Sequence, residues 1–137
     1  MRSLGLDVGD RRTGVAISDA NGILASPLAV IDNGDDKATI AEILRLAQQY
    51  QVQWLVVGLP YSLQGGIGQQ AGKVMNFARE LAHSGDIEVK LWDERFSTIA
   101  ADKLMVETGV KKRKKKERRD VIAATLILQG FLDSLER

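Results

Sequence analysis

The sequence contains no cysteine and a single histidine, which removes several kinds of chemistry from consideration. Disulfides and thiolate catalysis are excluded, and the lack of cysteine fits a protein of the reducing cytoplasm. His83 falls at the polar end of a predicted helix, where a surface position is expected. Histidine-based triads and zinc sites are therefore poor candidates, and any catalysis must come from carboxylates, hydroxyls or amines.

Long hydrophobic runs are also lacking. No stretch approaches the roughly 18–20 apolar residues that a membrane-spanning helix needs. The N-terminus enters a strand pattern at once and shows no apolar signal-peptide region. The chain has 137 residues, of which 45% are hydrophobic and 27% charged. This composition predicts one globular domain over residues 1–137, located in the cytoplasm and without a membrane partner.

The first third of the chain has the pattern of an antiparallel meander. Strands are predicted over Ser3–Val8, Thr13–Ser18 and Ile23–Ile31. Between the last two, Asp19-Ala-Asn-Gly22 has hairpin-turn chemistry because Asn and Gly tolerate a positive φ. Pro27 cannot donate a ladder hydrogen bond, which predicts that the third strand lies at an edge of the sheet.

The rest of the chain alternates between helix and strand. The predicted elements are a helix over Lys37–Tyr50, a buried strand over Trp54–Gly58, a helix around Ala71–Leu81, a strand over Ile87–Trp92, a helix from Ser97 or Thr98 to Glu107, and a last helix from near Asp120. This order predicts an α/β fold with a five-stranded mixed sheet, three antiparallel strands followed by two parallel ones, flanked by helices. Right-handed crossovers place the fourth strand beside the first, and a crevice is expected at the carboxyl ends of the strands.

A basic segment precedes the last helix. It comprises Lys111, Lys112, Arg113, Lys114, Lys115, Lys116, Arg118 and Arg119. These are eight of the 19 basic residues, so the remainder of the chain carries 11 basic and 17 acidic residues. A polycation on an acidic body predicts contact with the phosphates of a nucleic acid, from an arm between the last two helices that ends at Asp120. A solvated surface loop remains the alternative.

Asp7 is the most informative single acid because it lies in an apolar strand, Leu4-Gly-Leu-Asp-Val-Gly9. A buried carboxylate needs compensation, which a divalent cation or several backbone N–H groups could supply. Gly9 and Gly14 would let a ligand or another backbone approach closely. The alternative is that Asp7 closes a turn with Arg11 and Arg12.

Four motifs occur in order along the chain. They are Asp7-Val-Gly9 with Gly14-Val-Ala16, Val57-Gly-Leu-Pro60, Asp93-Glu-Arg-Phe-Ser-Thr98 and Asp120-Val-Ile-Ala-Ala124. With these motifs the chain resembles the YqgF family of the RNase H-like superfamily, which is related to the RuvC Holliday-junction resolvases. The resemblance implies an RNase H-like fold and a cytoplasmic nuclease that helps to process the 5′ end of the small-subunit (16S) ribosomal RNA precursor.

The resemblance also implies a site. Asp7, Glu94 (or Asp93) and Asp120 would be the catalytic acids and the ligands of Mg²⁺ or Mn²⁺, cations that prefer oxygen donors. The resemblance favours RNA as the partner, with structured DNA possible. The fifth strand should lie two strand spacings, about 10 Å, from the first. Glu94 either reaches inward to a cation at Asp7 or misses it, and a weak or single-metal site is the alternative.

The chain departs from RuvC-type resolvases at two positions. Those enzymes carry a glutamate at the end of the fourth strand, where this chain has Gly58-Leu-Pro60, and a second acid in the last helix, where it has Ala123. A non-catalytic RNA-binding module of ribosome assembly and a resolvase-like DNA nuclease therefore remain alternatives. A fragment of an actin-like ATPase is disfavoured, because such enzymes use two domains and this chain has no P-loop pattern.

Overall fold

The computed structural model describes residues 1–60, 68–94 and 115–135. The predicted helix from Ser97 or Thr98 to Glu107 lies outside these residues, as do residues 111–114 of the basic segment.

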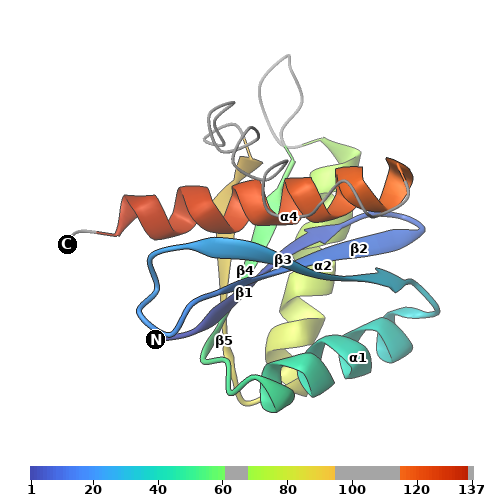
Figure 1. The fold of residues 1–137 in the computed structure, drawn as a ribbon. Helices are drawn as coiled ribbons and strands as arrows, with labels where there is room; N and C mark the ends of the chain where they lie inside the picture. The colour runs from blue at the N-terminus through green and yellow to red at the C-terminus, as the bar shows by residue number, and fades with distance from the viewer. Residues whose placement is uncertain (61–67, 95–114, 136–137) are drawn as a thin grey trace.

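The described residues form a five-stranded sheet with the order β3-β2-β1-β4-β5 (Figure 1). Its strands are β1 (Ser3–Val8), β2 (Arg12–Ser18), β3 (Ala25–Asp32), β4 (Trp54–Leu59) and β5 (Glu88–Asp93). The pairs β1–β2 and β2–β3 are antiparallel, whereas β1–β4 and β4–β5 are parallel. The predicted mixed sheet is confirmed, including the place of the fourth strand beside the first.

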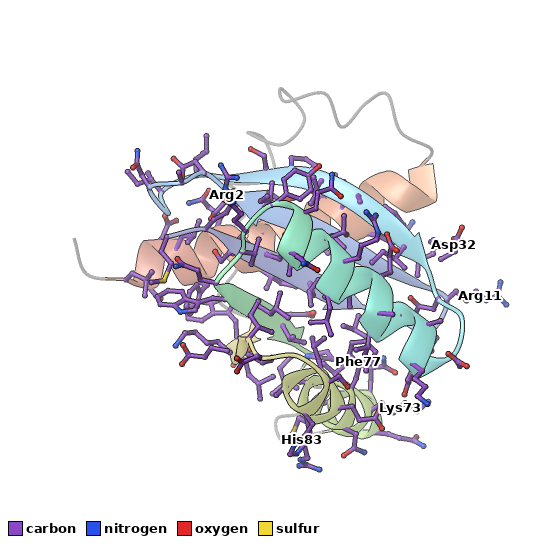
Figure 2. The ribbon with its side chains drawn as sticks, turned by 90° about the horizontal axis from the view of Figure 1, so that it is seen from below. Arg2, Arg11, Asp32, Lys73, Phe77 and His83 are labelled. Atoms are coloured by element: carbon purple, nitrogen blue, oxygen red, sulfur yellow. The ribbon has the colours of Figure 1, made fainter. Side chains whose placement is uncertain are left out.

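Among the described helices, two cover one face of the sheet and one covers the other (Figures 1 and 2). Figure 2, seen from below, shows α1 (Asp36–Gln49) and α2 (Gln69–Ser84) in front of the sheet, and α4 (Lys115–Ser134) behind it. None of these helices, within the part of the chain that is described, is both long and apolar enough to cross a bilayer.

Local sequence signals explain several element boundaries. The side chain of Asp35 accepts a hydrogen bond of 2.8 Å from the backbone N–H of Ala38 and thereby caps α1. Gly22 has a φ of +70° in the predicted hairpin, where the side chain of Asp19 accepts from two backbone N–H groups. Pro27 lies in β3, which is the edge strand that its lack of an N–H predicted.

The core has one layer on each face of the sheet. Toward α1 and α2, the larger cluster gathers aliphatic side chains of alternate strand residues, including Leu4, Leu6, Val15, Leu55 and Val57. Toward α4, the sheet presents small residues, and the helix supplies Ala124, Ile127, Leu128, Phe131 and Leu132. Trp54 and Trp92 each pack edge-on against Phe131, with ring centroids 6.0 Å apart.

Helix α4 approaches the sheet closely because glycines lie beneath it. A Cβ atom on Gly5 would stand 2.6 Å from the Cβ of Leu128 and 2.8 Å from the carbonyl oxygen of Ala124. Ala124 is fully buried at this contact. Because the strand residues beneath α4 include glycines, which have no side chain, the helix and its Asp120 lie close to the sheet.

The prediction that the last helix begins near Asp120 is wrong. Helix α4 begins at Lys115, so Lys115–Arg119 form helix rather than the end of an extended arm, and Asp120 lies in the second turn. Lys, Glu and Arg are good helix formers. Their propensity outweighs the unfavourable interaction of four basic side chains with the positive end of the helix dipole.

Candidate active site

Asp7 lies on the α4 side of the sheet. Its strand neighbours Leu6 and Val8 face the cluster beneath α1 and α2, so the alternation of β1 turns Asp7 to the opposite face. In the antiparallel pair β1–β2, Asp7 stands opposite Gly14. In the parallel pair β1–β4, Leu6 stands beside Val57, which places Gly58 next to Asp7. Asp7 is therefore flanked on both sides by glycines.

Glu94 directly follows β5 and reaches Asp7 across β4. One strand separates the two, yet their side chains are hydrogen-bonded to each other. A Cβ atom on Gly58 would stand only 3.1 Å from Oε1 of Glu94, which shows that the carboxyl group passes over this glycine. Glu94 meets Asp7 because β4 has no side chain at the crossing point. Of the two possibilities that the sequence left open for Glu94, the side chain reaches inward to Asp7.

Asp120 arrives from α4, above the other flanking glycine. Its carbonyl oxygen lies where a Cβ atom of Gly14 would be, so the helix backbone rests directly on β2. The carboxylate of Asp120 is close enough to raise the pKa of Asp7 through charge repulsion. Gly9 is approached by the backbone of its own turn, since its N–H donates to the carbonyl of Arg12 at 2.9 Å.

Burial and nearby charges raise the pKa values of Asp7 and Glu94. Burial, together with the smaller effects of the charges of Glu94 and Asp120, raises the pKa of Asp7 from 3.8 to about 7. Burial likewise raises the pKa of Glu94, against the hydrogen bond that it accepts from Asp7. The Asp7–Glu94 pair therefore holds a proton near neutral pH when no cation is present, with Asp7 as the donor.

Arg12 is the basic partner of Asp120. Its Nε donates a hydrogen bond of 2.6 Å to Oδ2 of Asp120, and both side chains retain partial solvent exposure. The alternative in which Asp7 closes a turn with Arg11 and Arg12 did not foresee this contact with Asp120. Period-two alternation could have revealed it, because Arg12 lies two residues before Gly14 and hence on the same α4-facing side of β2.

The residues at the site suit a hard divalent cation only in part. Within the described part of the chain, no three acidic, histidine or cysteine side chains are placed to hold one ion together. Asp7 and Glu94 are in direct contact, whereas Asp120 is engaged by Arg12. Mg²⁺ is commonly held by one or two carboxylates, with waters and substrate phosphates completing the shell. The Asp7–Glu94 pair is therefore the part of the site that suits such an ion.

The other predicted site residues lie as follows. Asp93 pairs with Leu59, a residue of the opposite core layer, so the alternation of β5 turns it away from Asp7 and favours Glu94 as the third acid. In the basic segment, Lys111, Lys112, Arg113 and Lys114 lie outside the described residues, and Lys115, Lys116 and Arg118 are placed by the helix backbone alone. Arg119 is exposed, one residue before Asp120.

A hollow of about 400 Å³ opens on the other face of the sheet, between the β1–β2 turn and α2. Val8, Gly9, Lys73 and Phe77 are among its lining residues, and Figure 2 shows Lys73 and Phe77 on α2. None of the three acids lines this hollow. The candidate active site is therefore the acid set beneath α4.

Solved structures with similar folds show the fold class of the chain. RuvC of Thermus thermophilus in complex with a Holliday junction substrate matches with a TM-score of 0.63 at 14% identity, over 97% of this chain and 96% of that chain. The Fowlpox virus resolvase in complex with Holliday junction DNA matches with a TM-score of 0.65 at 12% identity, over 100% of both chains. These similarities establish the RNase H-like α/β fold that RuvC-type resolvases share, as predicted.

The chain belongs to the RuvX family, since the family profile described as "RuvX: Holliday junction resolvase" matches residues 1–134. A Clostridium botulinum (strain Hall) protein named "Putative pre-16S rRNA nuclease" is 42% identical over 137 residues, which cover all of both chains. A Clostridium novyi (strain NT) protein of the same name is 41% identical over 135 residues, 98% of this chain and 100% of that one. The resemblance to the YqgF family and the expectation of a phosphodiester hydrolase are thereby confirmed.

Proposed function

We propose that this protein is a metal-dependent nuclease that cleaves RNA and takes part in processing the 5′ end of the 16S ribosomal RNA precursor in the cytoplasm. The observation that carries the proposal is the contact between Asp7 and Glu94, with Asp120 brought near them by α4. Two carboxyl groups from distant parts of the chain, Glu94 and Asp120, both raise the cost of ionising the buried Asp7. Such an arrangement is costly unless a cation or proton compensates it.

Asp7 and Glu94 would hold Mg²⁺ or Mn²⁺ from the sheet, and Asp120 would complete the set from α4. When bound, the cation would activate water and neutralise charge on the attacked phosphate. The pair's proton would be released on cation binding, because carboxylates ligate metals in the ionised form. RuvC-type resolvases carry a glutamate at the end of the fourth strand. In this chain the carboxyl group of Glu94 lies above Gly58 of β4, so Glu94 would supply an acid near the end of that strand from the neighbouring β5.

The basic segment, Lys111–Arg119, would attract the phosphate backbone toward these acids. Arg119 is exposed and directly precedes Asp120 in α4, so the segment is joined covalently to the site by one helix. Contacts of this kind do not depend on base sequence and weaken as salt concentration rises.

Cleavage of a labelled precursor RNA tests the proposal. We expect the wild-type protein to cleave it with Mn²⁺ or Mg²⁺ and not with EDTA, and Asp7→Asn to bind the RNA without cleaving it. Asp86→Asn is the matched control, because Asp86 is an exposed acid that precedes β5, at the opposite end of the strands from Glu94. Equal cleavage by wild type and Asp7→Asn would contradict the assigned chemistry.

A resolvase-like DNA nuclease is the second candidate, because the family profile is described by that activity and the fold is that of RuvC. A four-way DNA junction assayed beside the RNA distinguishes the two. Metal-dependent, Asp7-dependent cleavage of the junction alone would favour the DNA substrate. Binding of RNA with cleavage of neither substrate would favour a non-catalytic assembly module.

A further inference from the structure

Arg12 connects the β1–β2 turn to the candidate active site. Its guanidinium donates to Asp120 across 108 residues of sequence at 2.6 Å, which is a short, charge-assisted hydrogen bond. The side chain of Arg12 is 28% exposed and that of Asp120 is 20% exposed. A dissolved cation can therefore reach the pair, while partial burial keeps it less screened than an ordinary surface ion pair.

The backbone that carries Arg12 is held in place by the end of β3. The carbonyl of Arg12 accepts from Gly9, and the Asn33 side chain donates to the Gly9 carbonyl at 2.8 Å while accepting from the Thr13 hydroxyl at 2.9 Å. The Asn33 N–H also donates to the carbonyl of Arg11 at 2.9 Å. Arg12 thus projects from a fixed turn, so any change at its guanidinium comes from the side chain.

The ion pair engages Asp120, the acid of the set that comes from α4. Asp7 and Glu94 are hydrogen-bonded to each other, whereas Asp120 is paired with a permanent cation, since guanidinium keeps its charge at any physiological pH. A divalent ion that draws on all three acids therefore has to displace the guanidinium from Asp120.

We propose that Arg12 is a positioning residue that competes with the divalent cation for Asp120. The inference rests on the proposed metal-dependent function. In the metal-free protein Arg12 holds the carboxylate of Asp120 in an ion pair, and it lowers the affinity of the completed site because this ion pair must be broken. If Arg12 competes with the cation, its removal should increase the affinity for Mn²⁺. If Arg12 only stabilises the site, its removal should decrease that affinity.

Mn²⁺ binding, measured by calorimetry in the absence of RNA, tests this sign. We expect Arg12→Gln to bind Mn²⁺ about 3- to 10-fold more tightly than wild type, the range that corresponds to a partly exposed ion pair. Arg12→Lys keeps the charge and is expected to lie between the two. Circular dichroism confirms the fold of each variant, and Arg12→Lys serves if Arg12→Gln does not fold.

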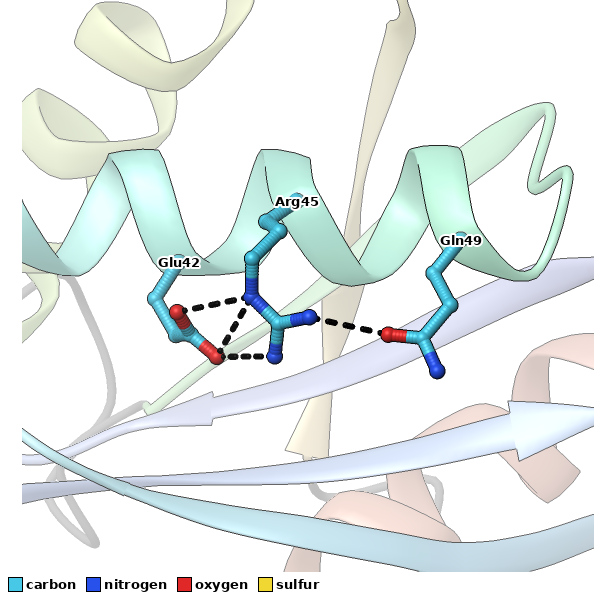
Figure 3. Close-up of polar contacts among 3 residues, drawn as sticks. All are labelled: Glu42, Arg45 and Gln49. Atoms are coloured by element: carbon cyan, nitrogen blue, oxygen red, sulfur yellow. Dashed lines mark hydrogen bonds and ion pairs between the residues drawn. The ribbon is translucent and has the colours of Figure 1, made fainter.

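The matched control is Arg45→Gln. Arg45 also forms a short ion pair, 2.6 Å from its Nη2 to Oε1 of Glu42, and also bonds Gln49, but it does so on exposed α1 at the other face of the sheet (Figure 3). Its substitution is expected to leave Mn²⁺ affinity unchanged. The control separates a local effect at Asp120 from a general effect of removing one positive charge.

The outcomes distinguish this inference from the proposed function. Asp7-dependent Mn²⁺ binding with equal or weaker affinity in Arg12→Gln would overturn the competition and leave the nuclease proposal standing. No binding in either wild type or Arg12→Gln would contradict both. Tighter binding in Arg12→Gln that is lost again on adding Asp120→Asn would support the competition directly.

Discussion

Asp7 and Glu94 are hydrogen-bonded to each other although the strands that lead to them are separated by β4. The contact exists because Gly58 leaves the crossing point on β4 without a side chain. The same strand position thus controls both the packing of α4 and the assembly of the acid set. This relationship yields the first prediction.

Gly58→Ala should separate Glu94 from Asp7. The new Cβ atom would meet the side chain of Ile127 and stand 3.1 Å from Oε1 of Glu94, so one of them has to move. We expect a loss of about 1–3 kcal/mol in unfolding free energy, as for overpacking elsewhere, and slower RNA cleavage. Urea unfolding and cleavage rates measure the two effects. Gly72→Ala in α2 is the control, because no atom lies within 4 Å of its Cβ position and helix propensity favours alanine.

The raised pKa of Asp7 predicts that stability falls as pH rises. Its pKa is about 7 in the folded protein against 3.8 as the ordinary value, so between these pH values the folded state binds more protons than the unfolded state. The contribution of Asp7 to the free energy of unfolding should therefore be fully present below about pH 4 and should decline as the pH rises toward 7.

Asp7→Asn removes this dependence. In EDTA, the variant should be more stable than wild type at pH 8 by an amount of the order of 1–3 kcal/mol, with a flatter profile between pH 4 and pH 8. Thermal unfolding over this pH range is the measurement. Added Mn²⁺ should stabilise wild type at pH 8 and not Asp7→Asn. A wild-type profile that rises from pH 4 to pH 8, with Asp7→Asn parallel to it, would refute the assigned burial of Asp7.

Gly14→Ala should displace α4 from the sheet. The added Cβ atom would overlap the carbonyl oxygen of Asp120, and a helix backbone cannot move aside as a flexible side chain can. We expect a loss of about 2 kcal/mol or more in unfolding free energy and a larger loss of cleavage, because Asp120 moves with the helix. Gly34→Ala is the comparison, since its Cβ would make an ordinary 3.4 Å contact with Ala38. Equal activity of the two variants would argue against a role for Asp120 at this depth.

Neutralising the first turns of α4 should weaken RNA binding without changing the chemistry. Replacing Lys115, Lys116, Arg118 and Arg119 by glutamine is expected to reduce the slope of log affinity against log salt by up to about 3. The cleavage rate at saturating RNA should change little. Filter binding at several salt concentrations measures the slope, and glutamine at four basic residues outside the segment, Lys37, Arg45, Lys73 and Arg79, provides the comparison. An unchanged slope would remove the segment from the RNA interface.

The sequence alone determined the order of the described elements, the topology of the sheet and the identity of Asp7 as an unusual acid. These follow from local causes: the period of apolar residues, turn residues such as Asn-Gly22, and the cost of a carboxylate in the apolar strand at Asp7. The start of α4 was the local feature that sequence reasoning missed, because Asp120 is a good cap and Lys115–Arg119 carry an unfavourable charge for a helix start.

The tertiary structure decided which acids meet and which basic side chain pairs with Asp120. Sequence spacing does not show that Glu94 crosses above Gly58 or that α4 is the backbone that rests on Gly14. Alternation places Arg12 on the α4 side of β2, but only the fold makes Asp120 its partner. Each depends on how closely two backbones approach after folding, and that distance is set by missing side chains on one element and apolar packing on another. Local preferences specify the elements, whereas close packing between residues far apart in the chain sets the site.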